Sequence, residues 1–292
     1  MRQIDEGIFY EDSFPGVTLG ALVFSEGIIV IDSPLRSDDA RSWRSMLMNH
    51  RGWTNRLLVN LDSHPDRTLG AKAMETTIVT HHMTAEIFKN RSTIFKGQGM
   101  MDTGSEWESY NEAIGMRWAT PEITFNERMV LHWNNSEIKL EHHPGATSEA
   151  IWVILPEEKV IFVGDTVVKN QPPFLADSDL NLWEAELDLL LKFYRDYVII
   201  SGRGGPATNE DIHEFRKFIR NVARRLERRA KKCLLPEVTE KMVPTLLSKF
   251  RFPRIEHDVY EKRLRYGLYQ CYLRNYSPLS ADDQSGFEGK NY

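Results

Sequence analysis

The stretch that decides the fold lies between residues 57 and 70 and reads Leu57-Leu58-Val59-Asn60-Leu61-Asp62-Ser63-His64-Pro65-Asp66-Arg67-Thr68-Leu69-Gly70. Its first three residues are apolar and typical of a short buried strand, and the polar residues after them predict a loop. In layered α/β proteins, functional side chains gather on loops at the ends of such strands. The loop from Asn60 to Gly70 is therefore the first place to look for a functional site.

Around this stretch the sequence predicts strands interspersed with helices. Strands are expected at Gly16 to Phe24, Gly27 to Asp32, Thr77 to Thr80, Met129 to Trp133, Glu137 to His142, Ile151 to Leu155, Val160 to Val163 and Tyr197 to Ile200. Helices are expected at Ser37 to His50, His82 to Asn90, Leu182 to Tyr194 and around Ile212 to Leu226. Residues 91–119 give a poor signal, with a helical insertion expected around Glu106 to Gly115. This order indicates a layered α/β architecture.

The composition is that of an ordinary globular protein. The 292 residues are 41% hydrophobic and 27% charged, which suits a single large α/β domain. A net charge of −5 calls for neither nucleic acid nor an acidic membrane as a partner. Cys233 and Cys271 lie far apart and are expected to be reduced thiols. No secretory signal and no membrane-length apolar run is visible, so we expect a cytoplasmic protein.

Three further loops at predicted strand ends carry residues capable of chemistry. They are His143-Pro144-Gly145-Ala146-Thr147, Phe162-Val163-Gly164-Asp165 and Gly202-Arg203-Gly204-Gly205-Pro206. Together with the loop after Val59, and following the N-terminal hairpin that ends in Ile31-Asp32-Ser33, these segments resemble in order the motifs of the metallo-β-lactamase fold family. The resemblance covers about residues 5–208.

The resemblance implies a fold, a domain layout and a chemistry. The fold would be a four-layer αββα sandwich with a helical C-terminal region. The domain would span residues 1–276, with a core at 5–208 and a helical part at 209–276, and residues 277–292 would form a disordered tail. In the family these loops hold two metal ions, usually zinc or iron, and a metal-bound hydroxide attacks an ester, thioester, amide or phosphodiester. A divalent cation makes this possible because it lowers the pKa of bound water to about 7.

The sequence departs from the family pattern at the metal-ligand positions. His64, Asp66 and Asp165 are retained, whereas Asp62, Arg67, Ala146 and Arg203 stand where the family has histidine. Arginine has five donors and no acceptor, so Arg67 and Arg203 cannot ligate a cation. The metal site that would have used Asp66, Asp165 and these two positions is therefore expected to be lost.

One interpretation of the remaining residues is a metal-free ionic cluster, and we favour it. Asp62, Asp66 and Asp165 would pair with Arg67 and Arg203, because buried carboxylates need partners and the arginine fork suits them geometrically. No cofactor is then expected.

The other interpretation retains one divalent ion. Asp62, His64 and Asp165 would hold iron, manganese or zinc, and His142 or His143 could add a further ligand. Asp66 would then act as general base toward the metal-bound water.

These interpretations lead to different functions. The first predicts a non-catalytic or repurposed protein in which Arg67, Arg203 and His143 bind a small anionic molecule, or one that binds a protein partner. The second predicts a one-metal hydrolase of an ester, thioester or phosphoester. A weaker alternative is RNA binding through the basic face of the helix at residues 209–231. There we favour a solvated face, because few aromatic residues interleave with the charges.

Overall fold

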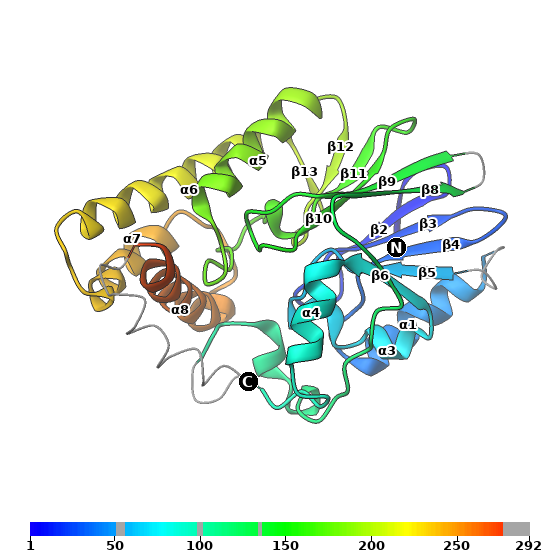
Figure 1. Cartoon of the computed structure of the whole chain (residues 1–292), viewed down its shortest axis with the longest axis horizontal. Helices are drawn as coiled ribbons and strands as arrows, with labels where there is room; N and C mark the ends of the chain where they lie inside the picture. The colour runs from blue at the N-terminus through cyan, green and yellow to red at the C-terminus, as the bar shows by residue number, and fades with distance from the viewer. Residues whose placement is uncertain (51–55, 98–101, 134–135, 277–292) are drawn as a thin grey trace.

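The computed structural model describes residues 1–50, 56–97, 102–133 and 136–276 (Figure 1). The predicted disordered tail at 277–292 lies outside these residues. Two β-sheets face each other at the centre, and helices cover both outer sides. Within the described ranges, no helix has both the length and the apolar character needed to cross a membrane.

The first sheet is built from the N-terminal half of the chain. Its seven strands follow the order of the sequence: β1 (Arg2–Asp5), β2 (Ile8–Glu11), β3 (Leu19–Val23), β4 (Ile28–Ile31), β5 (Arg56–Val59), β6 (Thr77–His81) and β7 (Ile123–Phe125). Strands β1 to β4 are antiparallel neighbours, and β4 to β7 are parallel. The carboxyl ends of β4, β5 and β6 therefore meet at one edge, where the loop after Val59 begins.

The second sheet has six strands. In spatial order they are β13 (Pro206–Ala207), β12 (Val198–Ile200), β11 (Val160–Phe162), β10 (Ile151–Leu155), β9 (Ser136–His142) and β8 (Arg128–Trp133). Strands β11 and β12 are parallel, so the residues that follow Phe162 and Ile200 leave the sheet at the same end. The backbone N–H of Gly202 donates to the carbonyl of Gly164, 2.7 Å away, and joins the two loops.

The core is divided into the layers of a sandwich. Between the sheets, apolar residues of both meet, among them Ile31 and Val59 from the first and Val153 and Phe162 from the second. A second cluster fills the space between the first sheet and helices α1 (Ser37–Met48) and α3 (Ala71–Met74). The largest cluster lies between the second sheet and the C-terminal helices. The expected four-layer αββα sandwich is therefore confirmed (Figure 1).

The remaining helices of the described residues comprise three that match predicted ones, a one-turn helix inside the loop expected at Asn60 to Gly70, and two in the expected helical C-terminal part. They are α2 (Pro65–Thr68), α4 (His82–Asn90), α5 (Leu180–Phe193), α6 (Asn209–Ala230), α7 (Val243–Leu247) and α8 (His257–Asn275). The insertion expected around Glu106 to Gly115 holds two short 3-10 turns, Glu106–Ser109 and Asn111–Ala113, in place of one helix. The insertion is held in place by side-chain contacts with Phe95 and neighbouring aromatic residues, and not by the burial of one helix face.

Candidate functional site: a buried arginine and aspartate cluster

The loop after β5 turns sharply into the one-turn helix α2. Proline occupies the first helical position, where its missing N–H is not needed, and His64 is the N-cap. The Nδ1 of His64 accepts the backbone N–H of Asp66 at 3.2 Å. The turn directs Asp66 and Arg67 inward, and both side chains are fully buried.

Arg67 connects three aspartates. Its guanidinium donates to Asp32 at 2.9 Å and to Asp165, and its Nε lies 3.2 Å from a carboxylate oxygen of Asp62. Asp32 follows β4, Asp62 follows β5 and Asp165 follows β11, so this one side chain joins both sheets. A planar cation with several donors can serve several carboxylates at once.

Arg203 lies beside Arg67 and shares one of its partners. Its Nε donates to the two carboxylate oxygens of Asp165 at 3.2 and 3.1 Å, and another nitrogen donates to Asp66 at 3.1 Å. The close approach depends on Gly202, because a Cβ there would lie 2.4 Å from an oxygen of Asp165. A side chain at that position would push the arginine loop away from the carboxylate.

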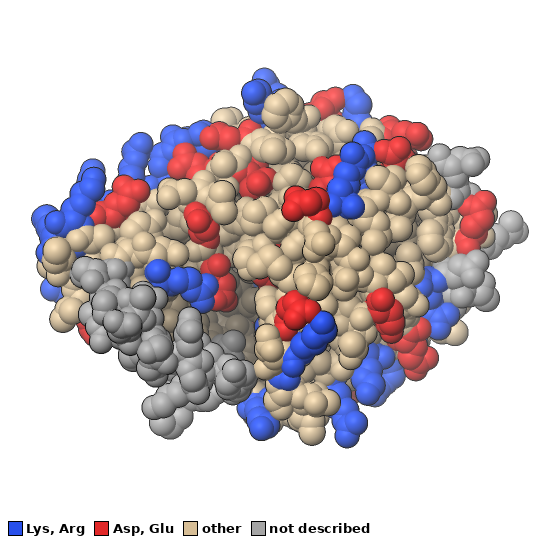
Figure 2. Space-filling view, in the orientation of Figure 1, with Lys and Arg blue, Asp and Glu red and all other residues tan. Residues whose placement is uncertain are grey.

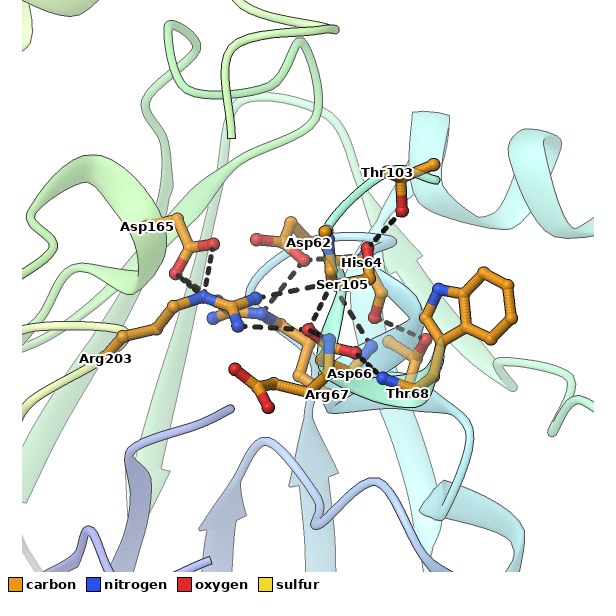
Figure 3. Close-up of polar contacts among 12 residues, drawn as sticks. Asp62, His64, Asp66, Arg67, Thr68, Thr103, Ser105, Asp165 and Arg203 are labelled. Carbon is orange, nitrogen blue, oxygen red and sulfur yellow. Dashed lines mark hydrogen bonds and ion pairs between the residues drawn. The ribbon is translucent and has the colours of Figure 1, made fainter. Parts of the chain in front are cut away.

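Six of the residues singled out in the sequence meet in one place: Asp62, His64, Asp66, Arg67, Asp165 and Arg203. Figure 3 shows the Arg203 guanidinium between Asp165 and Asp66, with Asp62 and His64 beside it. Arg203 and Asp66 are 137 residues apart in the sequence. The expected contacts of the two arginines with Asp66 and Asp165 are present, and Asp165 is shared by both guanidiniums.

The charges in the cluster give its acids unequal strengths. Burial alone would raise the pKa of Asp165, but Arg203 and Arg67 hold it well below its usual range. Burial is likewise outweighed at Asp66, where His64, Arg203 and Arg263 lower the pKa. Asp62 contacts the Nε side of Arg67 and accepts the backbone N–H of His64 at 2.8 Å, but burial outweighs these contacts and raises its pKa to about 7. Asp66 is therefore a weak base, which disfavours the general-base role considered for it.

The residues present do not fit the metal ions of the family. A cation placed between Asp66 and Asp165 would meet the guanidinium of Arg203, which carries a positive charge and offers no lone pair. The Nδ1 of His64 lies 3.3 Å from an Arg203 nitrogen and already accepts a backbone N–H. Across the described part of the chain, no three His, Cys, Asp or Glu side chains are arranged to hold a metal ion.

A cover closes the cluster from the side of the C-terminal helices. The backbone N–H groups of Glu106 and Trp107 donate to Asp66. The ring of Phe174 lies 4.3 Å from that of His64 and packs between two guanidiniums, with Arg203 at 4.7 Å and Arg263 of α8 at 4.1 Å. Arg263 is fully buried and donates to the carbonyl of Gly104 at 2.8 Å, so α8 is attached to the site.

Two histidines and an alanine from the same motifs lie elsewhere. His143 stacks on Trp152 with ring centroids 3.6 Å apart and bonds Glu186 at 2.7 Å. His142 contacts the carbonyl of Ser148 and stacks on His81. Ala146 belongs to the core beneath the helices. In the described residues no hydrogen bond or ion pair joins either histidine to the cluster. The predicted ligand role of His143 beside the two arginines is not supported by this placement.

Sequence reasoning missed two charged partners. Asp32 is fully buried, adopts a left-handed backbone (φ 58°) and accepts both Arg67 and the backbone N–H of Leu61. Asp32 could have been identified from the sequence, because it directly follows a buried strand in the hairpin that ends in Ile31-Asp32-Ser33. Arg263 gave no comparable signal, since it is one of several basic residues in a long helix.

Asp62 and His64 make opposite contributions to the pH dependence of stability. Burial raises the pKa of Asp62 from 3.8 to about 7, so the folded protein keeps a proton that the unfolded chain releases. This contribution is lost as the pH rises from about 4 to 7. Burial lowers the pKa of His64 from 6.5 to about 3, so its contribution is lost as the pH falls below about 6.5. The two oppose each other between about pH 4 and 6.5.

We therefore predict that single substitutions will reveal two opposite slopes. In Asp62→Asn the free energy of unfolding should rise with pH between about 4 and 6.5, more steeply than in the parent by up to about 1.4 kcal/mol per pH unit. In His64→Asn it should fall relative to the parent by a similar slope. Urea denaturation at several pH values measures both. Parallel pH profiles for the parent and both variants would contradict the inferred protonation states.

Comparisons with known proteins agree with this fold. The sequence profile of the metallo-beta-lactamase superfamily matches residues 63–203. No curated protein matches the sequence. The structure is similar to that of an inverting sec-alkylsulfatase from Pseudomonas sp., with a TM-score of 0.67, 14% identity and 97% of this chain covered. The chain spans 51% of that sulfatase.

Smaller enzymes are also similar. A metallo-beta-lactamase from Pontibacter korlensis has a TM-score of 0.55 and 17% identity, covering 75% of this chain and 98% of its own. DIM-1 metallo-beta-lactamase has a TM-score of 0.57 and 16% identity, covering 75% of this chain and 96% of its own. At these identities the likeness concerns the fold.

Proposed function

The chain belongs to the metallo-β-lactamase superfamily, and from this premise we propose that it is a non-hydrolytic member whose metal centre has been replaced by a structural ionic cluster. The observation that carries the proposal is the position of Arg203, which is buried between Asp66 and Asp165 and pairs with both. Two cations supplied by the chain balance carboxylates that would otherwise repel one another. The protein then acts by binding a partner.

The state of the would-be catalytic groups supports this proposal. Hydrolysis in the family needs a metal-bound water and a group to accept its proton. Here Asp66 accepts two backbone N–H groups and an arginine, and its pKa is lowered. Phe174 covers His64, which leaves the site poorly placed to receive a substrate.

A small anion bound by Arg67 and Arg203 is the less favoured form of the proposal. Both side chains are at most 1% exposed, and each guanidinium already donates to two carboxylates. Four carboxyl groups, those of Asp32, Asp62, Asp66 and Asp165, surround the two guanidiniums, so an anion would be repelled by those that are ionised, Asp66 and Asp165 above all. We therefore place partner binding on another surface.

The proposal predicts that the purified protein carries no stoichiometric metal. Elemental analysis of the full chain, purified without chelator or added metal, should give well below about 0.1 zinc, iron or manganese per chain. Its thermal midpoint should not change with EDTA or with added zinc. Hydrolysis of nitrophenyl ester, thioester and phosphodiester probes should match that of Asp62→Asn/His64→Asn.

The retained-metal alternative makes the contrary prediction. A single-site hydrolase would carry about one metal ion per chain, bound by Asp62, His64 and Asp165. Both metal and hydrolysis would then disappear together in Asp62→Asn/His64→Asn. That joint loss would overturn the proposal and establish the alternative.

A further inference from the structure

Helix α6 carries its charges in two unlike halves. In its N-terminal half, basic residues are neutralised by acids. Arg216 pairs with Asp188 at 2.7 Å, Arg220 pairs with Glu184, and Lys217 pairs with Glu214. The acids come from α6 itself and from the neighbouring α5, so this half is a mixed and balanced surface.

The C-terminal half is different. Residues 224–232 contain six basic side chains and one acid, Glu227: the basic residues are Arg224, Arg225, Arg228, Arg229, Lys231 and Lys232. Within the part of the chain that the structure describes, none of the six forms an ion pair. Arg225 and Arg229 are half-buried and bond along the helix, to Asn221 and to the carbonyl of Arg225. The other four are exposed.

Three of the exposed cations form one stripe. Arg224, Arg228 and Lys231 are spaced four and three residues apart, so they lie on the same face along α6 and just past its end at Ala230. At about 1.5 Å per residue the stripe is roughly 10 Å long. Figure 2 shows Lys and Arg side chains gathered along the outer side of this helix. A positive stripe on a chain with a net charge of −5 is a local feature, not a consequence of overall composition.

From this stripe we propose a binding surface for the phosphate backbone of single-stranded nucleic acid. Arginine suits phosphate because its planar fork donates two hydrogen bonds at once, and four of the six cations are arginines. No aromatic residue occurs at 224–232, so bases have no stacking partner there. Binding is therefore to the backbone and independent of base sequence.

A nucleic acid fits this surface better than a lipid membrane does. An amphipathic helix that lies in a membrane buries its apolar face in lipid. The apolar face of α6, including Phe215, Ile219 and Val222, is already packed against the second sheet and α5. The face of α6 that remains available to a partner is therefore its charged one. A charged face suits a flexible polyanion that can follow the stripe.

The test compares two triple variants of the full chain that remove the same number of charges. One is Arg224→Gln/Arg228→Gln/Lys231→Gln, and the matched control is Arg216→Gln/Lys217→Gln/Arg220→Gln in the paired half. Fluorescence anisotropy with a labelled 20-nucleotide oligouridylate, at salt concentrations from 50 to 200 mM, measures affinity and salt dependence. Circular dichroism checks that both variants are folded.

We expect the parent to bind with micromolar affinity at low salt. The 224/228/231 variant should bind about tenfold more weakly, and its plot of log affinity against log salt should be shallower by about 2, since three phosphate contacts are lost. The control should stay within about threefold of the parent. Equal weakening of both variants, no binding by the parent at 50 mM salt, or equal competition by phosphatidylserine vesicles would each overturn the proposal. It does not depend on the metal content of the protein.

Discussion

Replacement of Arg67 by methionine is expected to lower the free energy of unfolding by about 3–5 kcal/mol, a large part of the 5–15 kcal/mol that holds a typical domain together. The change removes the cation that contacts Asp32, Asp62 and Asp165 together, and among the described residues it leaves Asp32 and Asp62 with a backbone N–H donor each but no cation. Methionine fills part of the volume, so the loss comes mainly from unbalanced charge. Urea denaturation at pH 8 measures it.

The pH dependence of this destabilisation distinguishes an effect of charge from an effect of packing. Unpaired buried carboxylates have raised pKa values, so they become neutral as the pH falls. The destabilisation by Arg67→Met should therefore be smaller at pH 5 than at pH 8. Arg216→Met, on the half-buried face of α6, is the control and should change stability by less than about 1 kcal/mol. A protein as stable as the parent would show that Arg67 is dispensable and would remove the basis of the ionic-cluster proposal.

The double variant Arg67→His/Arg203→His is expected to convert the cluster into a zinc site. Both guanidiniums are replaced by imidazoles, which can ligate, and Asp66 and Asp165 are already within reach of those two side chains. Without zinc the variant should be strongly destabilised. With zinc at about a hundredfold excess over the dissociation constant, binding should restore about 2.7 kcal/mol.

Thermal unfolding with and without zinc, together with zinc counting after gel filtration, measures this change. The parent should show neither effect. Adding Asp165→Asn to the double variant should abolish zinc binding, because that carboxylate contacts both replaced positions. If the double variant folds normally without zinc and ignores it, Arg67 and Arg203 do not stand in the place of the metal ions.

The sequence predicted the framework of the fold and the identity of six cluster residues. The apolar runs Leu57-Leu58-Val59 in β5 and Val160-Ile161-Phe162 in β11 are short and lead into loops with polar residues or glycine, and this pattern depends only on neighbours in the sequence. The pairing of Arg203 with Asp66 was predictable because buried charges need partners and the motifs fix which loops meet.

What the sequence could not supply was the environment of these residues. The role of Arg263 depends on where α8 packs, and nothing local in residues 257–275 specifies contact with Gly104 or Phe174. The separation of His143 from the cluster depends on the direction of its side chain just after β9, where it stacks on Trp152 and bonds Glu186 of α5. The 3-10 turns near Trp107 were obscured because they rest on tertiary aromatic contacts, not on periodicity.

The sharing of Asp165 between two guanidiniums has a consequence for how the chain finds its native arrangement. Arg67 comes from the first sheet, whereas Asp165 and Arg203 come from the second, so the cluster assembles only when the sheets dock in one alignment. A misaligned docking would still bury apolar surface, but it would also bury at least one charged side chain without its partner. An unpaired buried charge of this kind lowers the free energy of unfolding by several kcal/mol. We therefore expect the cluster to destabilise incorrect alignments of the two sheets that hydrophobic contacts alone would not distinguish from the native one.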